Sequence, residues 1–237
     1  METSWVRNRS GCRLYPRCLY SCLALGLLGW TPAGAADAPS RWEKDIQAFE
    51  AADRTQPPPA NAIFFYGSSS IRLWKTLAED FDRLPVINRG FGGCQVADCV
   101  AFVDRVVTPH RPRQIVLYAG DNDLAAARTP EQIEADFREF VRRVHHRLPQ
   151  CWITFIAIKP SPARKALLDQ ARVANTRVRE VTRTHPRLSF IDIFTPMLGE
   201  DGQPRSEFFV ADQLHLNADG YRLWTKLTRP YLRTENP

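Results

Sequence analysis

The chain has 237 residues, 44% of them hydrophobic, with 12 glycines, 18 prolines and a formal net charge of +6. This apolar share suffices for a globular core and excludes a disordered, collagen-like or disulfide-framework chain. Residues 1–36 carry four of the arginines and one glutamate, so the rest of the chain has a net charge of only +3. Because no basic run remains there, we expect no nucleic-acid partner.

Residues 1–36 are typical of an export signal. An arginine-bearing start is followed by an apolar run over residues 18–30 and by the small residues 33–36. The run is shorter than the ~20 residues that cross a bilayer, and the small residues fit a cleavage site. We therefore expect a leader cleaved near Ala35, a domain over residues 37–237, and an exported, periplasmic or secreted protein without a stable membrane span. The alternative is an uncleaved N-terminal anchor.

Three of the six cysteines lie in the leader, and Cys94, Cys99 and Cys151 remain in the mature chain. An exported protein can form disulfides, but three is an odd number and no Cys-x-x-Cys motif or Cys/His cluster is left. We expect these cysteines to be small buried side chains rather than metal ligands or redox groups. The sequence does not decide whether two of them form a bridge.

An amphipathic pattern opens the mature chain. Ser40 has the spacing of a capping box, and Trp42, Ile46 and Phe49 share one helical face before prolines begin at Pro57. The pattern predicts an N-terminal helix that packs on the domain.

Short apolar runs rich in branched and aromatic residues then alternate with longer helical patterns. The five runs are residues 62–66, 85–88, 114–119, 152–158 and 188–193, and the clearest helices are residues 130–148 and 163–184. Such alternation predicts a five-stranded parallel sheet covered on both faces, which is a single α/β domain of three α/β/α layers. Ligands bind at the carboxyl ends of the strands in sheets of this kind.

Three of the predicted strands end in small or polar residues. The first is followed by GSSS at residues 67–70, which suits a serine nucleophile, a phosphate cradle or a plain turn. The second leads into NRGFGG at residues 88–93, where glycines allow the backbone to approach a ligand or simply form a turn. The third is followed by GDND at residues 120–123, which could act on a ligand or cap a helix.

A long irregular stretch, residues 194–214, follows the fifth predicted strand. Stretches of this length are more often functional than idle in compact domains. It leads into Asp212-Gln213-Leu214-His215, and Asp212 is the only aspartate with a histidine three positions later. Taken alone, His215 could equally be a surface residue ahead of a helix.

Together these segments favour acyl transfer. A serine, a glycine amide, an asparagine and an Asp/His pair all follow predicted strands at the edge where this fold binds ligands. Acyl transfer needs a hydroxyl nucleophile, a base, a carboxylate that orients the base, and donors for the oxyanion. A phosphate-binding module would not need the Asp/His pair.

In order and approximate spacing, the four blocks resemble those of the SGNH hydrolases, or GDSL esterase/lipase family, over about residues 61–229. The resemblance implies a flavodoxin-like fold without cofactor or metal, with Ser69 as nucleophile, His215 as base and Asp212 as its partner. It also implies an oxyanion hole formed by the Ser69 and Gly93 amides and the Asn122 side chain. Many members have Gly-Asp-Ser where this chain has Gly-Ser-Ser, so the choice of Ser69 over its neighbouring serines rests on the alignment.

We therefore expect an exported serine esterase that hydrolyses small-molecule or glycan esters through an acyl-enzyme. No apolar insertion that could form a lid separates Ser69 from Asn122, and the 194–214 stretch is mixed in character, so short acyl groups such as those of O-acetylated carbohydrates are expected. The alternatives are a carbohydrate O-acyltransferase and a non-catalytic glycan-binding module. A divalent-metal site at Asp121 and Asp123 is disfavoured, because two loop carboxylates are too few ligands.

Overall fold

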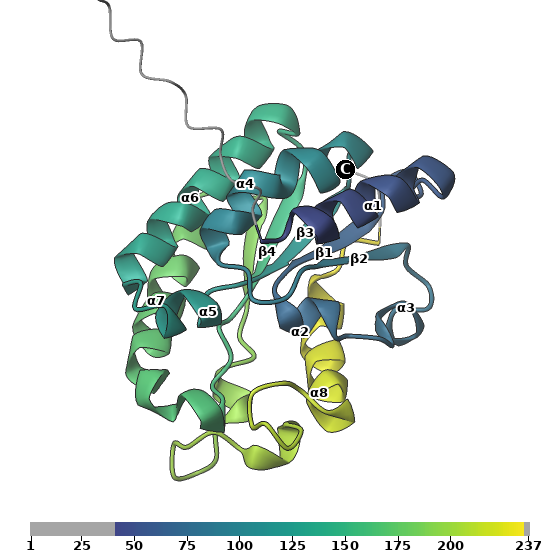
Figure 1. Cartoon of the computed structure of the whole chain (residues 1–237). Coiled ribbons are helices and arrows are strands. Elements are labelled where there is room, and N and C mark those ends of the chain that lie inside the picture. Colours follow the sequence, from purple (N-terminus) through teal and green to yellow (C-terminus); the bar gives the residue numbers. More distant parts are fainter. Residues whose placement is uncertain (1–40, 235–237) are drawn as a thin grey trace, which may run out of the picture. The chain divides into compact units, whose positions relative to one another are not determined.

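Five parallel strands form the centre of the computed structural model, which describes residues 41–234 (Figure 1). They are β1 (Ile63–Gly67), β2 (Val86–Gly90), β3 (Gln114–Tyr118), β4 (Trp152–Ile156) and β5 (Leu188–Ile191). Their order in the sheet is β2-β1-β3-β4-β5, and every neighbouring pair is parallel. The predicted fold class and strand number are confirmed, although β3, β4 and β5 end one or two residues earlier than expected. The predicted leader lies outside the described residues.

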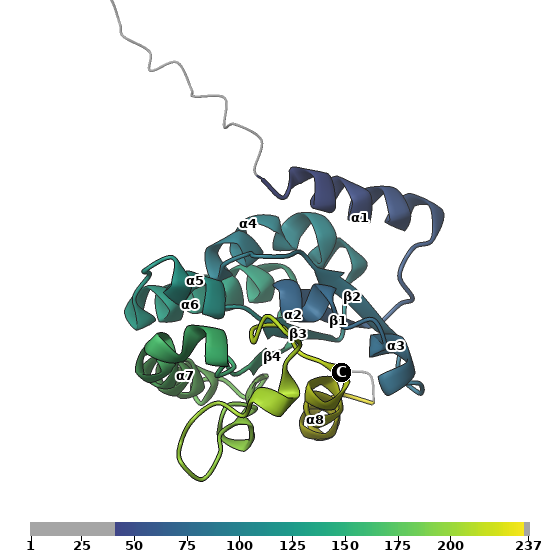
Figure 2. The ribbon, with the colours of Figure 1, turned by 60° about the horizontal axis from the view of Figure 1, so that its bottom comes forward.

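Alternate side chains of β1 face two different helical layers. Tyr66 stacks against Phe140, whereas its neighbour Phe65 packs against Trp74 and Phe81 on the opposite face. One layer contains α1 (Glu43–Thr55), α4 (Val96–Val106) and α6 (Pro130–Arg147), with α7 (Leu168–Thr182) packed beside α6. The other contains α2 (Ser69–Arg72), α3 (Leu77–Asp80) and α8 (Ala218–Thr228). Figure 2 shows α1 and α4 on one side of the sheet and α8 on the other, which is the predicted three-layer arrangement.

The two clearest helix predictions differ in outcome. The helix predicted over residues 130–148 is α6, in which the Thr129 hydroxyl accepts a hydrogen bond from the backbone N–H of Gln132 and Pro130 occupies the first turn. In contrast, α7 begins at Leu168 rather than near residue 163, because Pro162–Leu167 forms a 3₁₀ segment in which Arg164 has non-helical dihedral angles. This irregular segment matters for the site described below.

Helix α1 is attached to the sheet domain by both apolar and charged contacts. Its first residue is Glu43, so Trp42 precedes the helix, and the predicted cap Ser40 lies outside the described residues. Trp42 and Ile46 are buried, which confirms the apolar face. In addition, Arg105 of α4 forms ion pairs with Glu43 and Glu50 at 2.8 and 2.7 Å. The N-terminal helix is therefore an integral part of the domain.

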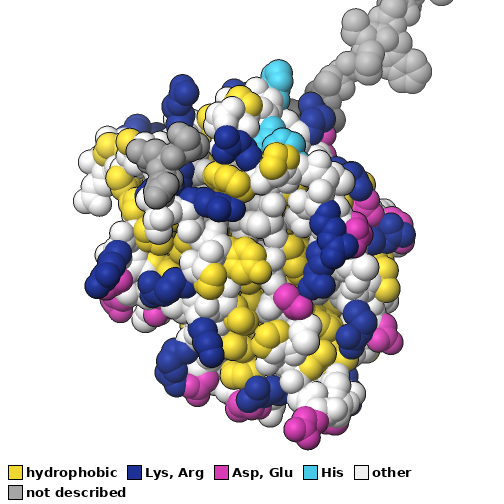
Figure 3. All heavy atoms as spheres, turned by 180° about the vertical axis from the view of Figure 1, so that it is seen from behind, with side chains coloured by type: hydrophobic (Ala, Val, Ile, Leu, Met, Phe, Trp, Pro, Cys, Tyr) yellow, Lys and Arg dark blue, Asp and Glu magenta, His cyan; other side chains and the backbone are white. Residues whose placement is uncertain are grey.

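The surface carries charges of both signs. On the face shown in Figure 3, Lys and Arg side chains are interspersed with Asp and Glu, and hydrophobic side chains reach the surface between them. Within residues 41–234, no helix combines the length and the apolar character that crossing a membrane requires.

Candidate active site

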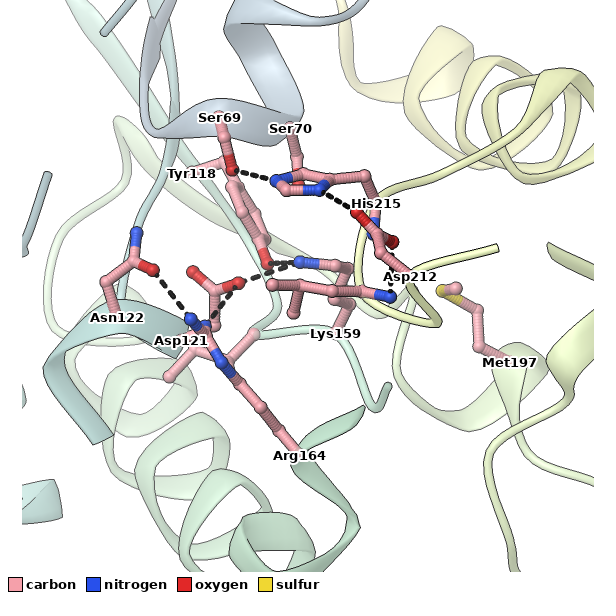
Figure 4. A network of polar contacts seen from close by, with 12 residues as sticks. Ser69, Ser70, Tyr118, Asp121, Asn122, Lys159, Arg164, Met197, Asp212 and His215 are labelled. Carbon is pink, nitrogen blue, oxygen red and sulfur yellow. Dashed lines mark hydrogen bonds and ion pairs between the residues drawn. The ribbon is translucent and has the colours of Figure 1, made fainter. Parts of the chain in front are cut away.

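Ser69, His215 and Asp212 form a continuous chain of hydrogen bonds at the carboxyl edge of the sheet (Figure 4). Ser69 is the first residue of α2, directly after β1, and its Oγ lies 3.1 Å from His215 Nε2. His215 Nδ1 lies 2.6 Å from Asp212 Oδ2. An ionised carboxylate only accepts, so Nδ1 carries the proton and Nε2 is free to accept from the Ser69 hydroxyl. The structure thus brings Ser69 together with a histidine that lies 146 positions later in the sequence and with that histidine's neighbour Asp212.

Local backbone geometry keeps Asp212 ionised. Its Oδ1 accepts hydrogen bonds from the backbone N–H groups of Leu214 and His215, each at 2.9 Å. The His215 backbone N–H and then the His215 ring lower the pKa of Asp212 to about 2. A carboxylate held in this way orients the imidazole and stabilises the imidazolium that forms when the ring accepts a proton.

The three adjacent serines differ in their surroundings. The Ser69 hydroxyl is the one that contacts His215, whereas the side chains of Ser68 and Ser70 are fully buried. Gly67 makes this turn feasible: it has a φ of +132°, and a Cβ at that position would lie 1.9 Å from the carbonyl oxygen of Tyr118. A side chain there would push β1 away from β3 and displace Ser69.

The other two predicted oxyanion donors lie in the segments that follow β2 and β3, and these segments are joined by a hydrogen bond. Gly93, in the turn after β2, has a φ of +81°, and Asn122 is the second residue of α5 (Asp121–Ala125) after β3. Asn122 Nδ2 donates to the carbonyl oxygen of Cys94 at 3.1 Å, and Asn122 Oδ1 accepts from Arg164 Nη2 at 2.9 Å. Because the first partner only accepts and the second only donates, these two bonds determine the orientation of the amide. One Nδ2 hydrogen remains for a substrate oxygen.

Arg164 belongs to a buried charged cluster that the sequence analysis missed. Asp121 Oδ2 lies 2.7 Å from Lys159 Nζ and 3.0 Å from Arg164 Nη1, and Lys159 also donates to the Tyr118 hydroxyl at 3.0 Å. Burial alone would raise the pKa of Asp121, but the charges of Lys159 and Arg164 outweigh it and hold the pKa below its usual value. The signal that could have pointed to the cluster is Lys159 itself, a lysine directly after an apolar run.

Asp121 and Asp123 do not form a metal site together. Asp121 is neutralised by the cluster above, and the carboxylate of Asp123 accepts from the backbone N–H of Val96 at 3.1 Å. Among the described residues there is no group of three potential metal ligands. Instead, Asp123 ties α5 to the first turn of α4, which follows the Gly93 loop.

The cysteines that the structure describes are all buried free thiols. Cys94 and Cys99 lie with their sulfur atoms 3.7 Å apart, and burial raises the pKa of each thiol. The expectation of small buried side chains is confirmed, and no disulfide links Cys94, Cys99 and Cys151 in this structure.

The chain belongs to the GDSL-like Lipase/Acylhydrolase family, whose model matches residues 62–223. The resemblance noted from the four sequence blocks is thus confirmed, and the protein is a carboxylic ester hydrolase. No match is found among curated proteins.

Solved structures share the fold at low sequence identity. A protein from Streptococcus pneumoniae superimposes with a TM-score of 0.73 and 20% identity, covering 81% of this chain and 92% of that one. A GDSL-like lipase from Bacteroides thetaiotaomicron gives 0.69 and 17%, covering 79% and 96%. A family 3 carbohydrate esterase from Clostridium thermocellum gives 0.56 and 15%, covering 73% and 97%. These likenesses extend over nearly the whole length of each relative.

Asp123 provides a test of the electrostatics beside the site. Burial raises its pKa to about 7, against about 4 in an unfolded chain, so between these values the folded state binds the proton more tightly and the free energy of unfolding falls as pH rises. Asp123→Asn removes this titration. The stability of the variant relative to the wild type should therefore increase as the pH rises from 4 to 7. The total increase is up to about 4 kcal/mol, because the pKa differs by about three units and each unit corresponds to 1.36 kcal/mol.

Urea unfolding at unit pH intervals measures this difference. Asp45→Asn, at an exposed position of α1, is the matched control for replacing a surface carboxylate with its amide. A difference between Asp123→Asn and the wild type that is constant from pH 4 to pH 8 would contradict the prediction.

Proposed function

We propose that this chain is an exported serine esterase that releases short acyl groups from ester substrates through an acyl-enzyme on Ser69. The observation that carries the proposal is the chain of hydrogen bonds from Ser69 Oγ through His215 to Asp212. A serine hydroxyl is a weak nucleophile, and this arrangement supplies both the base that activates it and the carboxylate that orients the base.

The reaction proceeds in two halves. His215 Nε2 takes the proton of Ser69 as Oγ attacks the ester carbonyl, and the imidazolium then protonates the leaving alcohol as the ester C–O bond breaks. Water next attacks the acyl-enzyme, again with His215 as base, and the carboxylic acid leaves as the Ser69 hydroxyl is restored. Asp212, with its pKa of about 2, remains an anion throughout.

The developing oxyanion is stabilised by three donors in this proposal: the backbone N–H groups of Ser69 and Gly93 and the side chain of Asn122. Ser69 lies at the start of α2, so its amide does not take part in an intrahelical bond. The Asn122 amide is held from both ends, by Cys94 and Arg164. Donors fixed before the reaction need no reorganisation when charge develops, which is the main source of their catalytic effect.

The proposed preference for short acyl groups rests on the loop before His215. Its two adjacent aromatic side chains, Phe208 and Phe209, are 8% and 5% exposed and belong to the core. They are therefore not available to line an acyl groove, and Val210, 41% exposed, is the large apolar side chain that this loop presents to solvent. Likeness in fold to a carbohydrate esterase supports O-acetylated carbohydrates as one substrate class.

One prediction of this proposal concerns the nucleophile and the base. Ser69→Ala and His215→Ala should each lower kcat by ~10⁴-fold or more, and the double variant should lose no more than either alone because the groups act as a unit. Ser68→Ala and Ser70→Ala are the matched controls and should retain most turnover. An active Ser69→Ala with an inactive neighbouring variant would move the nucleophile to that neighbour.

Asn122→Ala should lower kcat by ~10²- to 10³-fold with little effect on KM, because the amide is proposed to bind the oxyanion rather than the ground-state carbonyl. Steady-state kinetics with p-nitrophenyl acetate provide both constants. A raised KM at unchanged kcat would instead assign Asn122 to substrate binding.

Acyl-chain preference is measured by kcat/KM for p-nitrophenyl acetate, butyrate, octanoate and palmitate in one detergent. We expect the value to fall along this series, since each added CH₂ gains ~0.8 kcal/mol only where apolar surface receives it. A steady rise towards palmitate would indicate a lipase.

Export is the remaining part of the proposal and rests on the apolar run and small residues of the leader. Intact-mass measurement of protein recovered from the exported fraction should show a chain that begins near residue 36. A mass that includes residues 1–35 would show that the leader is retained as an anchor.

A further inference from the structure

Three consecutive carbonyl groups of the loop after β2 accept hydrogen bonds from side chains. The oxygen of Gly92 accepts from Trp42 Nε1 at 2.9 Å, and that of Gly93 accepts from Arg41 Nη2 at 2.8 Å. The oxygen of Cys94 accepts from Asn122, as described above. Two of these three donors come from the segment directly before α1, about 50 residues away in the sequence.

The bond to Gly92 has a consequence for its neighbour. The Gly92 carbonyl and the Gly93 N–H belong to one peptide unit, which is planar and, like every described peptide bond, not cis. In a trans peptide the C=O and N–H point in opposite directions. By holding the carbonyl on one side, the Trp42 indole determines the direction in which the Gly93 N–H points on the other.

The loop itself restrains this peptide weakly. Both residues that flank it are glycines, which populate positive and negative φ with similar ease, and Gly93 is at +81°. A Cβ built on Gly93 would have one neighbour within 4 Å, the Arg41 side chain at 3.8 Å. Gly93 therefore has no side chain of its own to fix this peptide, and the Trp42 indole supplies a hydrogen bond that selects one orientation.

Trp42 is well placed to act as such a fixed donor. Its side chain is 8% exposed, its ring packs edge-on against Phe91 at 5.9 Å between centroids, and the Arg41 guanidinium lies 3.9 Å from the ring centroid. The following helix is tied to α4 by Arg105. Trp42 lies outside the residues matched by the family model.

We propose that Trp42 is a positioning residue for catalysis: its indole N–H holds the Gly92–Gly93 peptide so that the Gly93 N–H is directed at the oxyanion. The inference rests on the proposed function, in which Gly93 is an oxyanion donor. It adds a role for the N-terminal helix segment, which keeps one donor of the oxyanion hole in place from outside the catalytic core.

Trp42→Phe tests the proposal, because phenylalanine keeps an aromatic ring against Phe91 and removes the N–H. We expect kcat to fall about tenfold, the effect of one positioning hydrogen bond lost in the transition state, with KM and the pH profile unchanged. The affinity of a boronic acid that adds to Ser69 as a tetrahedral adduct should fall by a similar factor. Turnover is expressed per active site, counted by complete labelling of Ser69 with a fluorophosphonate, so that a loss of folded protein is not mistaken for slower chemistry.

Trp152→Phe makes the same substitution at the amino end of β4 and should leave all these values unchanged. If Trp42→Phe retains the wild-type kcat and boronic-acid affinity, or changes KM alone, the inference is wrong. Ser69→Ala, assayed in parallel, separates the two proposals: an active Ser69→Ala overturns the proposed function, whereas an inactive Ser69→Ala beside a fully active Trp42→Phe overturns only the role of Trp42.

Discussion

The main-chain pairing of β1 between β2 and β3 determines where the functional groups lie. Gly67, the last residue of β1, pairs with Gly90 on one side and Tyr118 on the other. Two hydrogen bonds continue the ladder past the strand ends, from Phe91 N–H to the Gly67 carbonyl and from Ser68 N–H to the Tyr118 carbonyl. Three segments therefore leave the sheet at the same level and carry Ser69, the proposed nucleophile, and Gly93 and Asn122, the other proposed oxyanion donors. In parallel sheets the carboxyl ends of the strands generally lie at one edge. Here the absence of a side chain at Gly67 allows β1 to pair closely with β3 up to that edge.

A second constraint is the buried carboxylate of Asp121. Transferring a charge from water to the interior is costly unless it is paired, and Asp121 is paired with two cations that are themselves largely buried. Replacement by apolar residues could fill the same volume, but only the charged cluster leaves Arg164 with a guanidinium nitrogen to donate to Asn122. The charged cluster thus both neutralises the buried Asp121 and fixes the orientation of the Asn122 side-chain amide. This orientation connects the irregular Pro162–Leu167 segment to the chemistry at the sheet edge.

The parts of the molecule that could be predicted from the sequence are those encoded by local patterns. Five apolar runs identified the strands, the helical pattern over residues 130–148 identified α6, and the spacing of Asp212 and His215 singled out a pair that the structure joins by a hydrogen bond. The predicted ends of strands and helices were less accurate. A strand ends where its pairing with the neighbouring strands ends, and α7 begins late because the segment that supplies Arg164 precedes it. Lys159, Arg164 and the indole of Trp42 were missed as contributors to the site. Each acts through a partner at least 38 positions away, and no periodicity or motif records such a contact.

The groups of the site are held in place by two different kinds of structure. The proposed nucleophile and oxyanion donors follow paired strands, whereas the proposed base, His215, lies on a long loop whose geometry depends on α8. The His215 carbonyl accepts from Val210 N–H at 2.9 Å, and the Asn217 side chain, which caps α8, donates to the Glu207 and Phe209 carbonyls. Helix α8 is in turn joined to α2 by the Tyr221 hydroxyl, which donates to the Ser70 carbonyl at 3.0 Å. The residue next to the nucleophile is therefore bonded to the helix that supports the base, and this bond couples the distance between Ser69 and His215 to the packing of α8 rather than to the loop alone.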